Sequence, residues 1–280
     1  MTAVRIATWN LWWRFGDPDR RRPAIGAVLR ALDADVVGLQ EVWSRGEQHL
    51  AAELADELGR HVAFAGVPDA SPWTTRLGDD SHGLGVGVLS RWPLRDVRTE
   101  VLPAEGGPGS QVLLSVVVDS PAGSMRLVTT HLAPALTASA LRVRQVRALA
   151  HHVATADATD LPPVVVGDLN AEPASDEVRL LEGHLTAPAE PGLLLADTWR
   201  WARGPALLDG ATWRPDNPVV ALRGDPPSRV DYVLVGLDRG SVPVVVGRVG
   251  LFGDHGHPTP DGEVWASDHA GVVVDLQAGR

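Results

Sequence analysis

The chain has 280 residues, 44% of them hydrophobic, and no cysteine. The lack of thiols excludes disulfides and thiolate metal sites, so a bound metal ion would need Asp, Glu, Asn, His or water as ligands. The formal net charge is −10 and all 25 basic residues are arginines, which argues against general polyanion binding by bulk charge but leaves room for a local phosphate site.

The sequence shows no targeting or membrane signal. No basic segment followed by a long apolar run stands at its start, and no run approaches about 18 uninterrupted apolar residues. We therefore expect no transmembrane helix and predict a cytoplasmic protein. A chain of 280 residues suits either two domains or one large sandwich. Because no linker or low-complexity stretch interrupts it, we predict one domain, residues 1–280.

The first half of the chain consists of apolar strands separated by helical segments. Helices are predicted where apolar residues recur with helical spacing, and the second is followed by Gly59, a residue type common after a helix C-terminus. Residues 69–83 are polar and contain Pro, Gly and Asp, which predicts a loop. The predicted strands cover residues 4–11, 36–40, 61–66 and 84–90, and the predicted helices cover residues 23–32 and 46–58.

The second half is richer in strands. Two apolar strands flank the sequence Pro-Ala-Gly, which predicts a hairpin turn. Residues 184–227 contain many Pro, Gly and Trp residues and follow no clear pattern. The predicted strands cover residues 110–120, 124–132, 164–170, 228–236, 241–250 and 269–277, and the predicted helices cover residues 137–155 and 176–181. Hairpins mixed with strand–helix–strand passages indicate an α/β fold with helices outside two packed sheets.

Polar side chains occupy the points where the apolar strands stop. Any one of them alone fits a turn or a satisfied core position. Their recurrence after so many apolar runs is what indicates function, because ligand sites of α/β proteins gather beyond strand ends. Asn10, Glu41, His131, Asp168 and Asn170 end strands, Asp231 lies inside a predicted strand, and Asp268 and His269 open the last one.

The chemistry of this set suits a hard divalent cation beside a phosphate group. Glu41 and Asp268 are oxygen donors suited to Mg²⁺ or Mn²⁺, and the amide oxygen of Asn10 can support them. Asp168 is a candidate base for a water molecule, and Asn170 is a neutral donor for a phosphate oxygen. Strand alternation would direct these last two side chains to the same side.

A histidine and an aspartate complete the predicted chemistry. His269 can carry positive charge to a developing phosphorane or donate a proton. Asp231 can fix the tautomer of that imidazole, as a carboxylate does in hydrolytic triads. The set therefore predicts hydrolysis of a phosphoester.

Six short motifs carry a resemblance to a known family. In chain order they are "TWNLW", "LQEV", "THL", "GDLNAEP", "RVDYVLV" and "SDHAGVVVDL". Together they resemble the endonuclease/exonuclease/phosphatase superfamily, whose fold is similar to pancreatic deoxyribonuclease, over nearly the whole chain. The resemblance implies a four-layer α/β/β/α sandwich of two mostly antiparallel sheets. It also implies cleavage of a phosphoester by direct attack of a water molecule activated by Mg²⁺ or Mn²⁺ and an aspartate.

The resemblance also implies roles for individual residues. It makes Glu41 the principal metal ligand, with Asn10 and Asp268 as its helpers, and it makes Asn170 and His131 phosphate binders. The expected cofactor is accordingly Mg²⁺ or Mn²⁺.

In the same comparison Asp168 orients or deprotonates the attacking water, and His269, paired with Asp231, stabilises the transition state. No motif position departs from the family pattern, which argues against an inactive relative.

The sequence leaves the substrate open. Members of this superfamily cut DNA, RNA, phosphoinositides, sphingomyelin and small nucleotides, so the expected partner is a phosphoester in a nucleic acid, a nucleotide or a phospholipid headgroup. We expect a nuclease-like phosphodiesterase ahead of a lipid hydrolase, acting as a monomer. An arginine-lined groove would favour nucleic acid, and an exposed apolar rim would favour a lipid. The alternative of another class is a non-catalytic binding module on the same sandwich.

Weaker signals lie beside the motifs. Trp12, Trp13 and Trp43 follow two of the predicted ligands, and core filling is favoured over a stacking wall. His255 and His257 alternate in a segment that we interpret as a loop with incidental histidines, because alternation alone defines no metal geometry.

Two segments are candidates for substrate recognition, since long loops often carry specificity. They are residues 69–83 and the irregular region around Trp199, Trp201 and Trp213. The Arg20–Arg22 cluster is predicted to face solvent, as short charge runs usually do.

Overall fold

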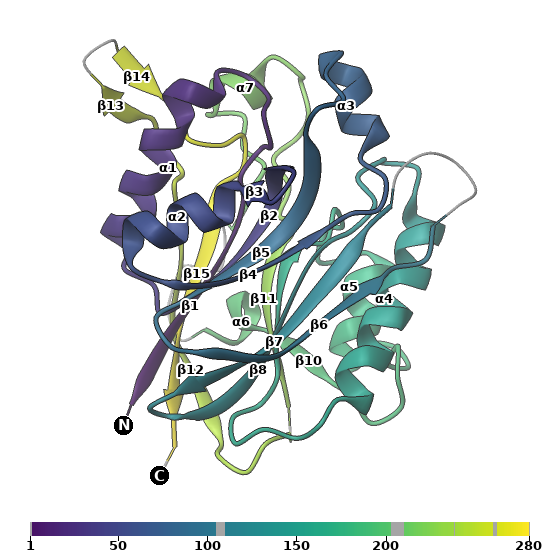
Figure 1. The fold of residues 1–280 in the computed structure, drawn as a ribbon. Helices are drawn as coiled ribbons and strands as arrows, with labels where there is room; N and C mark the ends of the chain where they lie inside the picture. Colours follow the sequence, from purple (N-terminus) through teal and green to yellow (C-terminus); the bar gives the residue numbers. More distant parts are fainter. Residues whose placement is uncertain (1, 105–109, 203–209, 238, 260–261, 280) are drawn as a thin grey trace.

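The computed structural model describes residues 2–104, 110–202, 210–237, 239–259 and 262–279. Within these residues, two large sheets pack face to face and helices cover both outer faces (Figure 1). This arrangement confirms the predicted α/β/β/α sandwich.

The first sheet joins both ends of the chain. Its strand order is β12 (Val244–Phe252), β15 (Gly271–Ala278), β1 (Ala3–Asn10), β2 (Val36–Arg45), β5 (Gly83–Ser90) and β4 (His61–Gly66), with the short β3 (Gln48–His49) paired to β2. The first and last long strands, β1 and β15, are antiparallel neighbours. Within the described residues, β1 and β2 are the one parallel pair of this sheet.

The second sheet comes from the middle of the chain. Its strand order is β10 (Leu195–Asp197), β11 (Asp231–Gly236), β9 (Val164–Asp168), β8 (Gly123–His131), β7 (Val112–Ser120) and β6 (Leu94–Val101). In the part of the chain that the structure describes, β8 and β9 are its one parallel pair. A separate hairpin is formed by β13 (His257–Thr259) and β14 (Gly262–Val264).

Valine-rich strands explain why the two sheets pack together. The inward faces of both sheets form one apolar cluster that includes Ile6, Val116, Val166 and Val274, each with no more than 1% of its surface exposed. β-branched side chains suit a pleated surface and lose little freedom there. The outward faces of several strands are also apolar because helices cover them, which accounts for strands that are hydrophobic throughout.

Four helices supply the outer layers. The helices α1 (Pro18–Leu32) and α2 (Leu50–Leu58) pack on the first sheet, and α4 (Ser139–Thr155) and α5 (Asp176–Glu182) pack on the second. Three shorter helices are α3 (Ser71–Leu77), α6 (Thr198–Trp201) and α7 (Pro218–Ala221). Figure 1 places α3, α7 and the β13–β14 hairpin together at one end of the sandwich, opposite the chain termini.

Several predicted boundaries are wrong for local reasons. The first helix begins at Pro18 because the side chain of Asp17 caps it by accepting a hydrogen bond from the backbone of Arg20. The second helix begins at Leu50 because Gly46 has a left-handed φ of 59° and β3 follows it.

Some elements lie where the sequence predicts a loop or no element. Within the predicted loop of residues 69–83, α3 forms around Trp73, whose side chain is 5% exposed. The edge strand β6 was not predicted because most of its residues are charged or polar and face solvent. In residues 184–227, left unassigned above, β10, α6 and α7 form, and residues 203–209 lie outside the described part of the chain.

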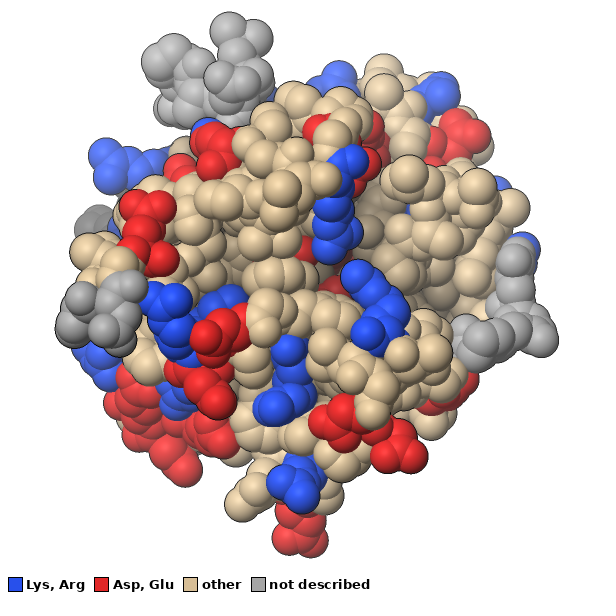
Figure 2. Space-filling view, turned by 90° about the horizontal axis from the view of Figure 1, so that it is seen from above, with Lys and Arg blue, Asp and Glu red and all other residues tan. Residues whose placement is uncertain are grey.

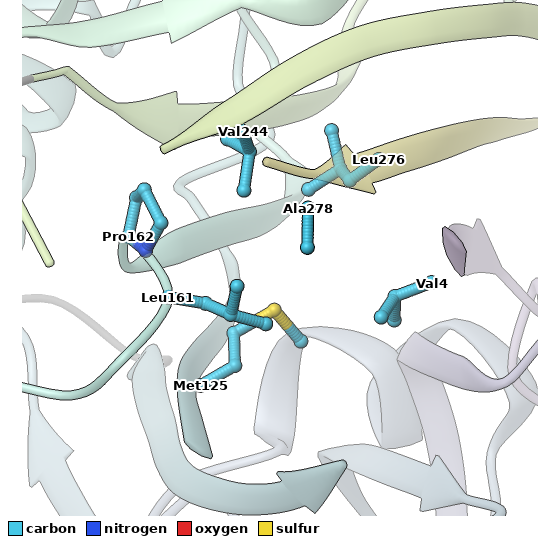
Figure 3. A pocket seen from close by; sticks show the side chains of 7 residues that line it. All are labelled: Val4, Met125, Leu161, Pro162, Val244, Leu276 and Ala278. Atoms are coloured by element: carbon cyan, nitrogen blue, oxygen red, sulfur yellow. The ribbon is translucent and has the colours of Figure 1, made fainter. Parts of the chain in front are cut away.

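A small apolar pocket lies between the sheets at the end that holds the termini (Figure 3). Its free volume is about 10 Å³, roughly one water-sized sphere. Carbon-rich side chains line it, so it is a packing gap and offers no chemistry; they belong to Val4, Met125, Leu161, Pro162, Val244, Leu276 and Ala278. Among the described residues, no helix has the length and apolar character needed to cross a membrane.

Candidate active site

Three neighbouring strands of the second sheet bring ionisable side chains into one row. Asp231 lies opposite Asp168 in the β11–β9 ladder, and His131 lies opposite Asp168 in the β8–β9 ladder. All three residues are buried, with at most 5% of their surface exposed. Like charges directly opposite each other destabilise a sheet. Packing alone therefore does not account for this row.

Three neighbouring strands of the first sheet supply a second row. Asn10 ends β1, while Asp268 and His269 directly precede β15. Glu41 lies in β2 at a β-bulge, where the register with β5 shifts. Its φ of 51° is left-handed, a conformation uncommon for residues other than glycine. Bulges re-aim side chains, and strained backbone clusters at functional sites.

Hydrogen bonds and close contacts join the two rows across the sheet interface. Nδ2 of Asn10 donates to Oδ2 of Asp168 at 3.0 Å, and Nδ1 of His269 lies 2.9 Å from Oδ2 of Asp231. The same oxygen of Asp168 lies 3.6 Å from Nε2 of His131 and 3.9 Å from Nε2 of His269. Asp168 is thus at the centre of the cluster.

Burial and neighbouring charges shift the pKa values in this cluster. Burial raises the pKa of Asp168, and the charge of Asp231 raises it further. Burial opposes protonation of His269, but Asp231, Asp168 and Asp268 outweigh it and raise the pKa of that imidazole to about 10. The arrangement favours an imidazolium beside two carboxyl groups near neutral pH, and it makes Asp168 a stronger base than a free aspartate.

Two buried carboxylate oxygens without a hydrogen-bond partner fit a cation. Among the described residues, none donates to Oε2 of Glu41 or to Oδ1 of Asp268. Burial raises the pKa of Asp268 to about 7, and the nearby charge of Glu41 contributes to the rise. Desolvated carboxylates are costly unless a counter-charge is present. A hard divalent cation with oxygen ligands, such as Mg²⁺ or Mn²⁺, suits this donor set.

A second group also has metal-like spacing. The ligand atoms of Asp168, Asp231 and His269 all lie within 4.8 Å of one another. Nδ1 of His269, however, is already engaged by Asp231, and a protonated imidazole has no free lone pair for a metal. The geometry of this group therefore favours proton transfer and charge stabilisation over metal binding.

The side chains of the two asparagines in the predicted site are already engaged in hydrogen bonds within the protein. The amide oxygen of Asn10 accepts a hydrogen bond from the backbone of Trp12 at 2.9 Å. Asn170 has a left-handed φ of 47°, its backbone donates to Oδ1 of Asp168, and its Nδ2 donates to the carbonyl of Leu132. Strand alternation does not relate Asp168 to Asn170, because β9 ends at Asp168.

Arg21 is a residue that the sequence interpretation missed. It was predicted to face solvent, yet only 3% of it is exposed. Its guanidinium donates to five backbone carbonyls within 3.1 Å, and burial lowers its pKa to about 10, so it stays charged. It thereby connects the segment after β1 to the segment before β15; the carbonyls belong to Leu11, Trp12, Trp13, Phe15 and Ala266.

Two further polar residues hold the segment before β15. Oγ of Ser267 donates to the carbonyl of Asn10 at 2.6 Å and accepts from the backbone of His269 at 3.2 Å. Nδ2 of Asn217, at the start of α7, donates to the carbonyl of Ser267 at 2.9 Å. The serine directly before the Asp-His motif was a usable signal for Ser267. Nothing in the sequence around Asn217 marks it.

Aromatic rings pack against both histidines of the site. The rings of Trp73 and His131 lie 6.0 Å apart, and those of Trp213 and His269 lie 5.0 Å apart, both edge to face. Trp73 comes from α3, so the segment 69–83 does reach the site. Such contacts fix the orientation of the imidazoles.

The remaining tryptophans and histidines named in the sequence analysis agree with their predictions only in part. Trp13 is 1% exposed and belongs to the core, whereas Trp12 and Trp43 are only half-buried. His255 is exposed beside Asp254, and His257 begins the β13–β14 hairpin where a plain loop was expected.

The sequence matches the Endonuclease/Exonuclease/phosphatase family over residues 7–269. No curated protein sequence matches it. Among solved structures, an endonuclease/exonuclease/phosphatase from Beutenbergia cavernae is 26% identical, with a TM-score of 0.70 over 100% of this chain and 72% of that one.

Two more distant structures share the fold. D. rerio TDP2 complexed with single strand DNA product is 18% identical, with a TM-score of 0.69 over 99% of this chain and 100% of that one. The human Nocturnin catalytic domain with bound sulfate anion is also 18% identical, with a TM-score of 0.68 over 99% of this chain and 95% of that one. From the family match over nearly all of its length, the chain belongs to the endonuclease/exonuclease/phosphatase family.

Proposed function

We propose that this protein hydrolyses a phosphodiester bond with water and a divalent cation, Mg²⁺ or Mn²⁺, in a nuclease-like reaction. The observation that carries the proposal is the meeting of Asp168, Asp231 and His269 with the unpartnered oxygens of Glu41 and Asp268 at the strand ends of two sheets. Family membership supports the same class of chemistry.

Glu41 and Asp268 would hold the cation, with Asn10 beside them. When bound, such an ion offsets negative charge on the phosphoryl oxygens as a Lewis acid. Asn10 also donates to Asp168, so it couples the cation site to the proposed base. Glu41 is half-buried while Asp268 is 4% exposed, so the cation would lie at the solvent side of the cluster.

The proton-transfer chemistry would belong to the second group. Asp168, whose pKa is raised by burial, accepts a proton from a water molecule as that water forms the new bond to phosphorus. The ester bond to the leaving oxygen breaks in the same displacement. The imidazolium of His269, held by Asp231, stabilises the added negative charge and can supply the proton to the leaving oxygen.

His131 and Asn170 would bind the phosphoryl oxygens. Nε2 of His131 faces Asp168, and the Nδ2 group of Asn170 has one proton engaged by the carbonyl of Leu132 and one left to donate. Loss of one donor of this kind typically lowers the rate by about 10²–10³.

The test uses the purified protein and bis-p-nitrophenyl phosphate, a small phosphodiester. We expect turnover with Mg²⁺ or Mn²⁺, loss of turnover in EDTA, and a fall of about 10²–10³ in kcat for Asp168→Asn. Asp119→Asn, an exposed aspartate on β7, is the control and should keep normal turnover. Full activity in EDTA, or normal turnover by Asp168→Asn, would refute the proposal.

A nucleic acid is the first substrate class that we propose. The similar TDP2 structure holds a single-stranded DNA product, and the present chain shares its fold. A phospholipid headgroup is the second class, and one observation favours it. Leu136, five positions after His131, and Leu222, which directly precedes Arg223, are 91% and 90% exposed, which is unusual for leucine and suits contact with an apolar phase.

A further inference from the structure

We infer that arginines at the rim of the site bind phosphates on both sides of the scissile one, so that the substrate is a single-stranded nucleic acid. The inference rests on the proposed phosphodiester hydrolysis. Its basis is the placement of Arg14, Arg76 and Arg223, each of which stacks over an aromatic ring.

The first two arginines belong to one wall of the site. The guanidinium of Arg76, on α3, lies 4.4 Å from the ring centre of Phe15, and that of Arg14 lies 6.0 Å from the ring centre of Trp43. Phe15 in turn packs against the ring of Trp13 at 5.4 Å. Both arginines therefore rest on one aromatic cluster, in which Trp13 and Phe15 follow Asn10 in the chain and Trp43 comes from β2.

The third arginine lies at the other side of the catalytic groups. The guanidinium of Arg223 is 4.8 Å from the ring centre of Trp213 and 3.7 Å from Oδ2 of Asp268. A continuous line of contacts crosses the site from α3 to this arginine; it runs through Trp73, His131, Asp168, His269, Trp213 and Arg223. The arginines thus bracket the groups proposed to act on the scissile phosphate.

Charge pairing distinguishes Arg14 and Arg76 from most arginines of this protein. Exposed arginines elsewhere, such as Arg91 and Arg95, pair with aspartates. For Arg14 and Arg76, no ion pair with a carboxylate is found among the described residues. In a chain of net charge −10, positive charge left without a carboxylate beside an acidic site is available for a substrate phosphate.

The surface at this end of the sandwich carries arginines around a hollow (Figure 2). Figure 2 looks down on the end that carries α3 and α7, and arginine side chains stand on both sides of a hollow that has acidic atoms at its floor. A polynucleotide has phosphates before and after the one that is cut, whereas a phospholipid carries apolar tails on one side. Charges on both sides therefore fit a strand.

Half-buried aromatic faces favour a single strand over a duplex. Trp12 and Trp43 lie beside the arginine wall and keep part of their surface open. Unstacked bases bind such faces, each contributing about 1–3 kcal/mol. A duplex keeps its base faces stacked inside and cannot offer them to these rings.

The test compares two double variants with the same charge change. Arg14→Gln/Arg76→Gln removes the wall, and Arg147→Gln/Arg248→Gln is the matched control, because Arg147 and Arg248 are exposed on α4 and β12 and also have no ion pair among the described residues. The substrates are bis-p-nitrophenyl phosphate and a labelled single-stranded oligonucleotide, each with Mg²⁺ and with Mn²⁺. Thermal melting confirms that both variants fold.

We expect the wall variant to lose at least about tenfold more kcat/KM on the oligonucleotide than on the small diester, and the control to lose less than about twofold on either. The slope of log kcat/KM against log salt should fall by about 1.4 for two lost phosphate contacts on a single strand. Equal losses on both substrates, or an equal loss in the control, would overturn the inference.

Failure of the proposed function has a different signature. If the wild-type protein cleaves neither substrate with either metal, the proposed function fails, and fluorescence anisotropy with the oligonucleotide in EDTA then decides the inference. Binding that weakens about tenfold in the wall variant alone would support it. Co-sedimentation with phosphatidylglycerol vesicles in place of oligonucleotide binding would overturn it in favour of a lipid.

Discussion

Nδ1 of His269 lies 2.9 Å from Oδ2 of Asp231, although 38 positions separate the two residues in the chain. The pair joins the segment before β15 in one sheet to the first residue of β11 in the other. Asp231 is also the largest favourable influence on the pKa of His269, which rises to about 10 against the opposing effect of burial. The positive charge of the imidazole therefore depends on this carboxylate.

We predict that Asp231→Asn lowers kcat by about 10²–10⁴ while KM changes little, because the amide keeps the shape but not the charge that holds His269 protonated. The measurement is steady-state kinetics on bis-p-nitrophenyl phosphate, with Asp119→Asn as control. A raised KM with a normal kcat would contradict the role given to the pair.

Asp268→Asn should separate stability from function. The pKa of Asp268 is raised from 3.8 to about 7 by burial, so the folded state binds this proton more tightly than the unfolded state. Stability from this group is complete below pH 4 and is lost as the pH rises through 7. The amide of Asp268→Asn does not ionise, so the variant is not destabilised in this way at high pH. We therefore expect its metal-free melting temperature at pH 8 to exceed that of the wild type by about 3 °C or more.

Added Mg²⁺ or Mn²⁺ should reverse that order. A cation that binds only the folded state raises the melting temperature of the wild type as its concentration increases. The Asn variant loses a carboxylate whose Oδ1 has no hydrogen-bond partner among the described residues, and it should respond much less. Equal metal-induced shifts in both proteins would show that Asp268 does not hold the ion.

The sequence was sufficient for the sandwich and for the set of residues at the strand ends. Apolar strands with polar ends are a local pattern: Asp168 and His131 are the last residues of such strands, and Asp231 is the first residue of another. Strand alternation could not place Asn170, because its left-handed backbone lies beyond the end of β9. Whether strands pair is a long-range property, so the direct opposition of Asp168 and Asp231 appears only in the fold.

The sequence could not predict the roles of polar residues that bind distant backbone groups. Ser267 and Asn217 act on carbonyls and amides that only the folded chain brings near them. The edge strand β6 was missed for a related reason. Its Asp96 has a left-handed φ of 48° and binds the buried Arg126 of β8. The sequence does not reveal this partner, and a polar stretch with a charged residue does not predict a strand.

We predict that Asp96→Asn lowers the free energy of unfolding by about 1–3 kcal/mol at pH 7, because it leaves a buried guanidinium with a weaker partner. Arg126 is 2% exposed and its Nη2 donates to Asp96 at 2.7 Å, which lowers the pKa of that carboxyl. A lowered pKa means that the stabilisation is present above about pH 4 and is lost as the pH falls through the folded value. Urea unfolding at pH 7 and pH 3 checks this: the difference from the wild type should shrink at pH 3, and a constant difference would contradict it.

Arg21 offers the sharpest test of how the cation site is supported. All five of its donated hydrogen bonds go to backbone carbonyls, and two of those carbonyls belong to Trp12 and Trp13, whose φ values of 56° and 36° are left-handed. A backbone in this strained state persists only if its surroundings hold it. Arg21→Met leaves the five carbonyls without a donor, so we expect the free energy of unfolding to fall by about 3–5 kcal/mol.

Arg21→Lys separates charge from geometry. Lysine keeps a positive charge near Glu41 and Asp268 but has three donors where arginine has five. We expect it to lose less stability than the Met variant and yet to bind Mn²⁺ more weakly than the wild type, because Asn10 and Asp268 are attached to the two segments that Arg21 connects. Urea unfolding and Mn²⁺ titration followed by electron paramagnetic resonance measure both effects, with the exposed Arg20→Lys as control. Wild-type Mn²⁺ affinity in Arg21→Lys would show that the charge alone, and not the five-carbonyl geometry, supports the site.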